Sequence, residues 1–102
     1  MKKIIAGKKY DTETAKALGE YWNGFGFNDF AYVSETLYLK RTGEFFLHGV
    51  GGASSKYSQR IGNNSYCSGE RIIPLSEAEA REWAEEHLEC DEYEKIFGEV
   101  EE

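Results

Sequence analysis

The chain has 102 residues and a formal net charge of −7, with 40% hydrophobic residues, 15% aromatic residues and a single proline. This composition excludes an intrinsically disordered chain, and no apolar run approaches the roughly 18 residues that a membrane-spanning helix needs. Two cysteines are too few for the disulfide framework of a small secreted protein. We therefore expect a single domain over residues 1–102, without a signal peptide or membrane association, in the cytoplasm.

Charge is divided unevenly along the chain. Residues 76–102 hold 12 acidic residues against two basic ones, a local balance of −10, whereas residues 1–75 carry +3. So acidic a segment repels nucleic acid and anionic lipid, and it attracts the basic protein surfaces that normally hold nucleic acid.

The first third of the chain predicts a short strand or tight hairpin followed by a helix. Residues 3–6 and 9–10 flank Gly7-Lys8, where the hairpin would turn. Oxygen-bearing side chains at residues 11–14 could cap a helix, and apolar residues then recur at helical spacing at Ala15, Leu18, Tyr21 and Trp22. This helix should end near Asn23-Gly24.

The middle of the chain predicts loops around a β-hairpin. Residues 24–34 are aromatic and punctuated by glycine, which favours a loop or an irregular strand. Residues 35–40 and 44–50 alternate around Gly43, as two hairpin strands do. The stretch 51–69 reads as loop, with a short helix near 55–60. Residues 71–75 read as a short strand, and Pro74 indicates either the end of that strand or a sheet edge.

The C-terminal quarter predicts two helices. Ser76 and Glu79 fit a capping box, and an apolar stripe follows at Ala80, Trp83, Ala84, His87 and Leu88. A second helix over 91–97 should end at Gly98, and the last few residues should fray. Together these elements predict an α+β domain: an antiparallel sheet of three to four strands, an N-terminal helix and a C-terminal acidic helical pair over 76–102.

Candidate catalytic and metal-binding residues are few. His48, Cys67, His87 and Cys90 equal the four ligands of a structural zinc site, but no Cys-x-x-Cys pair supports one. A cysteine–histidine or serine–histidine pair lacks a nucleophile motif, and the segment 49–56 departs from the phosphate-loop pattern. We therefore expect no catalytic activity, no cofactor and no metal, although convergence of the four His and Cys residues stays open.

Two binding surfaces are predicted. The first is the acidic face of the helical pair, with these residues expected to contact a basic partner: Glu79, Glu82, Glu85, Glu86, Glu89, Asp91, Glu92 and Glu94. The alternative is an aromatic and basic surface for single-stranded nucleic acid, formed by Phe25, Phe27, Lys40, Arg41, Lys56 and Arg60. We favour burial of the rings between residues 21 and 32 in the core, which makes direct nucleic-acid binding the weaker hypothesis. If exposed beside a sheet edge, these rings would equally suit a homodimer interface.

Several segments together resemble those of a known family. They are Lys-Lys-Ile-Ile at 2–5, Gly-Lys-Lys-Tyr-Asp-Thr-Glu-Thr-Ala at 7–15, Glu-Thr-Leu-Tyr at 35–38, Arg-Thr-Gly-Glu-Phe-Phe-Leu at 41–47, Gly-Gly at 51–52, Ser-Lys-Tyr at 55–57, Ile-Ile-Pro-Leu at 72–75, and Ala followed by Trp-Ala-Glu within 80–85. On these segments the chain resembles a small, mostly uncharacterised family of phage and mobile-element proteins from Gram-positive bacteria. The resemblance covers nearly the whole chain, concerns fold and turns, and supplies no catalytic residues.

The resemblance implies a function by class analogy. Phage and mobile-element proteins of this size and acidity include anti-CRISPR inhibitors of Cas9, which work in the cytoplasm of the bacterial host cell. We therefore expect a non-catalytic inhibitor that binds a basic nucleic-acid-binding effector, with a CRISPR-Cas9 complex as the leading candidate. The alternative is a nucleic-acid-binding accessory module that uses the aromatic and basic surface.

Overall fold

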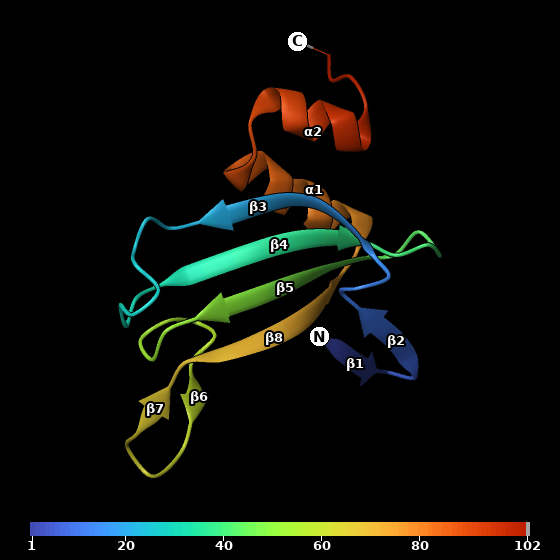
Figure 1. The fold of residues 1–102 in the computed structure, drawn as a ribbon. Coiled ribbons are helices and arrows are strands. Elements are labelled where there is room, and N and C mark those ends of the chain that lie inside the picture. The colour runs from blue at the N-terminus through green and yellow to red at the C-terminus, as the bar shows by residue number, and fades with distance from the viewer. Residues whose placement is uncertain (102) are drawn as a thin grey trace.

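The computed structural model describes residues 1–101 and is dominated by strands (Figure 1). Eight strands form three antiparallel sheets, and two helices follow the last strand. The elements are β1 (Lys2–Ile5), β2 (Lys8–Asp11), β3 (Lys16–Trp22), β4 (Val33–Leu39), β5 (Phe45–Gly51), β6 (Gln59–Arg60), β7 (Tyr66–Cys67), β8 (Gly69–Leu75), α1 (Glu77–His87) and α2 (Cys90–Phe97). Within residues 1–101, no helix is both long enough and apolar enough to cross a membrane.

The main sheet has four strands in the order β3-β4-β5-β8, with α1 packed on one of its faces and α2 next to α1, beyond the β3 edge (Figure 1). The expected hairpin over 35–50 is present as β4 and β5, and Gly43 takes a positive φ of 91° in its turn. The predicted edge position of the strand with Pro74 is confirmed, because β8 pairs only with β5 among the described strands.

The predicted fold class was wrong in two respects. There is no helix near the N-terminus, and the strands number eight in three sheets instead of three or four in one. The segment predicted as a helix over 15–22 is largely strand β3. The short helix expected near 55–60 is absent too, since turns lead there into β6.

A β-bulge explains the misleading helical spacing in β3. Pairing with β4 shifts between Ala17 and Gly19, so Leu18 is an extra residue in the strand. A bulge lets residues three apart share one face of a sheet, where an ordinary strand places residues two apart. Leu18 and Tyr21 therefore both pack towards the helices, which imitates helical periodicity.

The residues expected to cap that helix form a turn instead. The Asp11 carboxylate accepts a hydrogen bond from the Glu13 backbone N–H at 2.9 Å, and its carbonyl accepts one from Ala15 N–H at 3.1 Å. Aspartate closes turns in this way as readily as it caps helices. The preceding hairpin, β1–β2, matches the prediction, and positive φ angles at Ala6 and Gly7 fit its two-residue turn.

The apolar core lies on both faces of the main sheet. Leu37, Leu47 and Phe45 pack against Ala80, Trp83 and Ala84 on the helical side. On the opposite face Phe46 is fully buried between Tyr10, which meets it edge-on at 5.4 Å, and the stacked ring of Tyr38 at 5.1 Å. The β1–β2 hairpin thus covers one end of that face and leaves the other end open.

Candidate functional site

Helix α1 carries the first half of the predicted acidic face. Its capping box is present: Ser76 Oγ accepts from Glu79 N–H at 3.1 Å, and Glu79 accepts from Ser76 N–H at 2.9 Å. These hydrogen bonds from Ser76 lower the pKa of Glu79. Ala80, Trp83 and Ala84 are buried against the sheet, so the glutamates on the other side of the helix point into solvent.

Helix α2 carries the second half. Tyr93, Ile96 and Phe97 pack against the helical core cluster, and α2 contacts α1. Arg81 is one of two cations in residues 76–102, and it lies between the two helices with its guanidinium 4.6 Å from the centre of the Phe97 ring. The same guanidinium pairs with Glu77 at 3.3 Å. It is therefore paired with a glutamate that is not one of the eight predicted residues.

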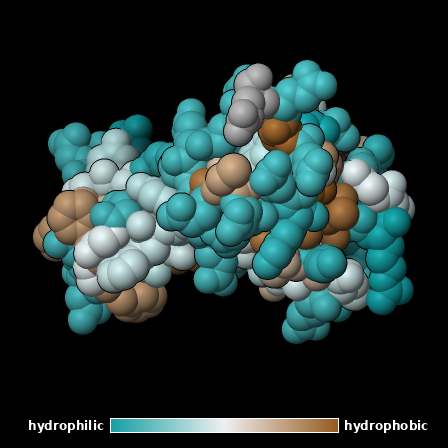
Figure 2. Space-filling view, turned by 90° about the horizontal axis from the view of Figure 1, so that it is seen from above, coloured by the Kyte–Doolittle hydropathy of each residue, from teal (hydrophilic) through white to brown (hydrophobic). Residues whose placement is uncertain are grey.

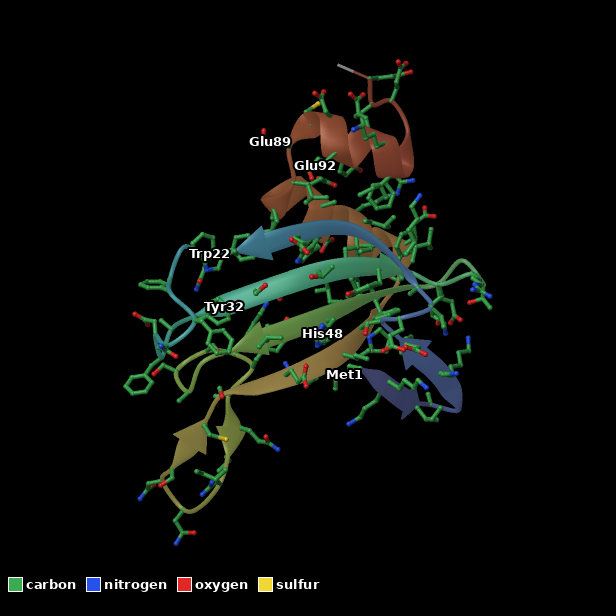
Figure 3. All side chains as sticks on the ribbon, viewed as in Figure 1. Met1, Trp22, Tyr32, His48, Glu89 and Glu92 are labelled. Atoms are coloured by element: carbon green, nitrogen blue, oxygen red, sulfur yellow. The ribbon has the colours of Figure 1, made fainter. Side chains whose placement is uncertain are left out.

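The structure places all eight predicted acidic residues on these two helices and the joint between them. Only Glu94 is half-buried, and the other seven are exposed. We define the acidic helical surface as Glu79, Glu82, Glu85, Glu86, Glu89, Asp91, Glu92 and Glu94. Glu89 and Glu92 lie on the side of the molecule away from the β1–β2 hairpin (Figure 3), and hydrophilic side chains cover most of the view onto the helices (Figure 2).

Members of this surface differ in what they contact. Glu92 accepts from the Glu89 backbone N–H at 3.3 Å, and Glu94 accepts from Val100 N–H at 3.1 Å. The charge of Glu94 also raises the pKa of the neighbouring Cys90 thiol. By contrast Glu82, Glu85 and Asp91 make no ion pair with any part of the chain that the structure describes. These three carboxylates are free to meet an external cation.

The alternative aromatic and basic residues do not form one surface. Phe25 and Phe27 lie in the β3–β4 loop, whereas Lys40 and Arg41 lie at the turn beyond the opposite end of β4. That strand has seven residues and spans roughly 20 Å. Three of the four cations are also occupied: Lys40 pairs with Glu44 at 3.1 Å, Lys56 pairs with Glu35 at 2.7 Å, and Arg60 donates to the carbonyls of Gly62 and Asn63.

The four His and Cys residues do not converge. His48 lies on the open face of the main sheet and contacts Glu70 at 2.7 Å, while His87 lies on the helical face, stacked on Tyr21 at 3.9 Å. No group of three or more His, Cys, Asp or Glu side chains within residues 1–101 is arranged to hold a metal. Both cysteines have free thiols.

A buried carboxylate that sequence reasoning missed fastens α1 to the sheet. Glu35 on β4 is 1% exposed, and it accepts hydrogen bonds from Trp83 Nε1 at 3.1 Å and from the Tyr57 hydroxyl. Lys56 Nζ lies 2.7 Å from the same carboxylate. Glu35 is in phase with the core residues Leu37 and Leu39, so its place in that alternation was the available signal.

The environment of Glu35 keeps it ionised. Burial alone would raise its pKa, but the hydrogen bonds from Lys56, Tyr57 and Trp83 together outweigh burial and lower the pKa below its ordinary value. Burial and the neighbouring Glu35 charge raise the pKa of Tyr57 in turn, so its hydroxyl stays a donor. The network holds charge inside the fold and leaves no buried side-chain polar atom of residues 1–101 without a partner.

Gly49 makes room for this network. A Cβ atom there would lie 1.9 Å from the Tyr57 ring, so only glycine lets the ring lie flat on β5. Tyr57 is 3% exposed and anchors the segment that follows β5. The network of Glu35, Tyr57 and Trp83 thus joins the sheet, this segment and α1, and it positions the acidic helical surface.

The expectation that the rings of the β3–β4 loop are buried was wrong. Trp22, Phe25, Phe27 and Phe30 are all exposed, Phe27 by 77% of its surface. White and light-brown side chains gather at one end of Figure 2, which is the end of Figure 1 where β3 meets β4. Trp22 and Tyr32 lie at this end (Figure 3). The backbone explains the exposure, since the loop is tied to the sheet by hydrogen bonds and not by ring burial.

In comparisons with known proteins, no protein-family model, curated protein or solved structure matches the chain.

Proposed function

We propose that the protein is a non-catalytic inhibitor that binds a basic nucleic-acid-binding protein through the acidic helical surface. The observation that supports this proposal is the exposure of so many carboxylates on one helical layer. Seven of the eight residues of that surface are exposed, and Arg81 pairs with Glu77, which is not one of the eight, and lies against the Phe97 ring. A segment with a balance of −10 thus presents its charge outward.

The physical reason is electrostatic complementarity. Carboxylates three and four residues apart on a helix lie about 5–6 Å apart at Cβ, so α1 presents a dense row of negative charge. A protein groove that neutralises phosphates with Lys and Arg would meet these carboxylates where the nucleic acid otherwise lies. Complementary charge also accelerates association and selects the partner.

For the partner and its location we propose what the resemblance described under the sequence suggests by class analogy. Phage and mobile-element proteins of this size include Cas9 inhibitors, so guide-loaded Cas9 in the cytoplasm of the bacterial host is the first candidate. The alternative, direct binding of single-stranded nucleic acid, is disfavoured because Phe25 and Phe27 lie at the far end of the sheet from Lys40 and Arg41.

A matched pair of charge-reversed variants tests the proposal. E82K/E85K reverses two exposed glutamates of the acidic helical surface that make no described ion pair. E13K/E20K reverses two exposed glutamates on the β2–β3 turn and β3 and changes the net charge equally. Affinity for guide-loaded Cas9 is measured for both by biolayer interferometry.

The proposal expects E82K/E85K to weaken binding at least tenfold and E13K/E20K to bind nearly as the parent does. Equal losses in both variants would mean that only net charge matters. Full binding by E82K/E85K would refute the role of this surface, and failure of the parent protein to bind would remove Cas9 as the partner.

A further inference from the structure

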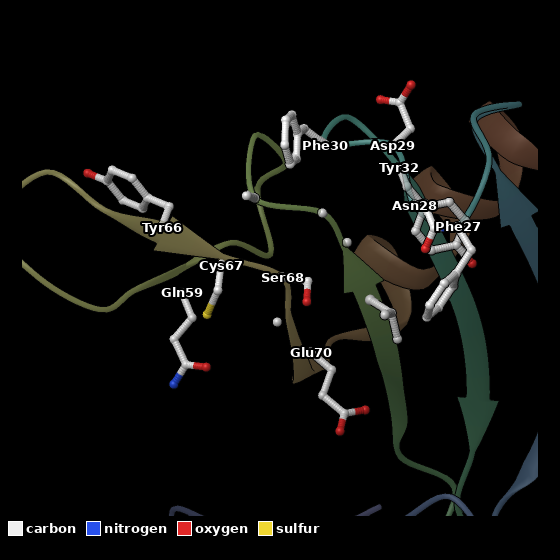
Figure 4. Close-up of a pocket in the computed structure, with 15 residues that line it drawn as sticks. Phe27, Asn28, Asp29, Phe30, Tyr32, Gln59, Tyr66, Cys67, Ser68 and Glu70 are labelled. Atoms are coloured by element: carbon white, nitrogen blue, oxygen red, sulfur yellow. The ribbon is translucent and has the colours of Figure 1, made fainter.

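An open cleft lies at the end of the main sheet farthest from the β4–β5 turn. It has a volume of about 820 Å³ and lies between the β3–β4 loop on one side and the β6–β7 hairpin on the other. Its floor is formed by the facing ends of β5 and β8 (Figure 4). The acidic helical surface contributes no residue to its lining.

The walls of the cleft are built on a fixed backbone. Gly52 N–H donates to the Tyr32 carbonyl at 2.9 Å, and Ser54 N–H donates to the Phe30 carbonyl at 2.8 Å. A Cβ atom on Gly52 would lie 2.5 Å from the carbonyl oxygens of both Asp29 and Phe30, so the loop packs as closely as glycine permits. The rings are thus held outward by a preformed scaffold, as in binding loops.

Aromatic rings flank the cleft from both sides. Phe27 and Phe30 come from the β3–β4 loop and Tyr66 from β7, and each exposes more than half of its surface. Phe27 also meets Tyr32 edge-on at 5.6 Å. Rings left in water on a fixed scaffold do not contribute to the core, and exposed apolar groups gathered in one place indicate an interaction site.

The charge of the cleft is negative. Asp29 and Glu70 are its only charged lining residues, and no Lys or Arg of the described chain lines it. Arg60, on the adjacent β6, folds back to donate to Gly62 and Asn63. Glu70 contacts His48 through Oε2, which leaves Oε1 without a described partner. Carboxylates here repel phosphates, so the rings are poorly suited to stacking nucleic-acid bases.

We propose that this cleft binds cationic side chains, arginine foremost, from an extended basic polypeptide segment. Guanidinium groups of such a segment would stack on exposed rings such as Phe30 and Tyr66 by cation–π attraction, and another would pair with the free oxygen of Glu70. The cleft thus offers both kinds of group that attract cations, aromatic rings and carboxylates. The inference rests on the cleft's own residues and holds whether or not the acidic helical surface binds Cas9.

A peptide titration followed by amide NMR tests this inference. The probe is acetyl-Gly-Arg-Gly-Arg-Gly-amide, and its control carries citrulline, which keeps the shape of arginine and lacks the charge. The arginine peptide is expected to produce saturable shifts at Gly51, Gly52 and Gly69, which line the cleft. The citrulline peptide should leave these amides unchanged.

Variants separate the cleft from the rest of the acidic protein. Phe30→Ala and Glu70→Gln should each weaken the affinity for the arginine peptide roughly twofold to thirtyfold. Phe25→Ala removes an exposed ring that does not line the cleft and should bind as the parent does. The E82K/E85K variant should still show the peptide-induced amide shifts at the cleft, even if it no longer binds Cas9.

Four results of the binding experiments would overturn the inference. They are the absence of saturable shifts up to the solubility limit of the peptide, equal binding of the citrulline peptide, shifts confined to α1 and α2, and tighter binding of a single-stranded dT oligonucleotide at the same amides. Concentration-dependent dimerisation that buries the cleft would also overturn it, because a second copy would then be the occupant. Circular dichroism of each variant confirms that a loss of binding is not a loss of fold.

Discussion

The buried carboxylate of Glu35 offers the most demanding test of the fold. Glu35→Ala leaves the Trp83 indole N–H and the Tyr57 hydroxyl without their acceptor, and both side chains are buried. An unsatisfied buried donor costs about 1–3 kcal/mol, so the two together predict a loss of about 2–6 kcal/mol in the free energy of unfolding. Lys56 adds little to this sum, because its side chain is 59% exposed and returns to water.

Urea unfolding followed by tryptophan fluorescence measures this loss. For a domain of this size, each kcal/mol also lowers the melting temperature by about 4–8 °C, so thermal unfolding provides a second readout. The control is Glu20→Ala on β3, an exposed glutamate whose removal should change stability by less than about 0.5 kcal/mol. A loss below about 1 kcal/mol for Glu35→Ala would refute the view that this network fastens α1 to the sheet.

Three further predictions concern Glu35, Gly49 and Glu44. Because the pKa of Glu35 is lower in the folded chain than its ordinary value of 4.5, its contribution to stability is complete above that value and is lost as the pH falls through the folded pKa. Urea unfolding at a series of pH values should therefore show an acid-induced loss that is smaller in Glu35→Gln, and equal losses in both would contradict this. Gly49→Ala should destabilise by at least about 1–3 kcal/mol because its Cβ overlaps the Tyr57 ring, whereas Gly26→Ala, which meets nothing within 4 Å, should be nearly neutral by the same urea assay. Hydrogen bonds from Lys8 and Lys40 lower the pKa of Glu44 to about 2, so Lys8→Met should raise that pKa in a carboxyl NMR titration, and an unchanged value would show that Lys8 does not contact Glu44 in solution.

Local signals predicted the elements whose pattern is undisturbed. The capping box at Ser76 and Glu79 fixed the start of α1, and the apolar stripe through Trp83 gave its buried face. The alternation on either side of Gly43 gave the β4–β5 hairpin. In these segments the local preference and the tertiary packing agree, which is the condition under which sequence patterns are informative.

The remaining elements depend on contacts between distant parts of the chain. The bulge at Leu18 is defined only by the pairing of β3 with β4, and without that pairing its apolar spacing is helical. The partners of Glu35 come from residues 22 and 48 positions away. Composition alone could not show that the rings of Phe27 and Phe30 lie outside the core, because the backbone bonds that hold them outward involve Gly52 and Ser54.

For the candidate site, the sequence predicted the acidic helical surface but not the cleft. When one face of a helix is apolar and buried, its charged side chains lie on the opposite face. The exposure of Glu82 and Glu85 therefore followed from the spacing of Ala80, Trp83 and Ala84. The cleft joins residues 27–32 to residues 66–70, and nothing in either segment indicates the other.

The central claim is that the acidic helical surface occupies a groove that otherwise holds nucleic acid. The most direct measurement is the affinity of the purified protein for guide-loaded Cas9, with and without bound target DNA, at two salt concentrations. The account predicts binding that weakens steeply with salt and is lost when target DNA is already bound. Binding that is insensitive to salt and unaffected by target DNA would contradict it.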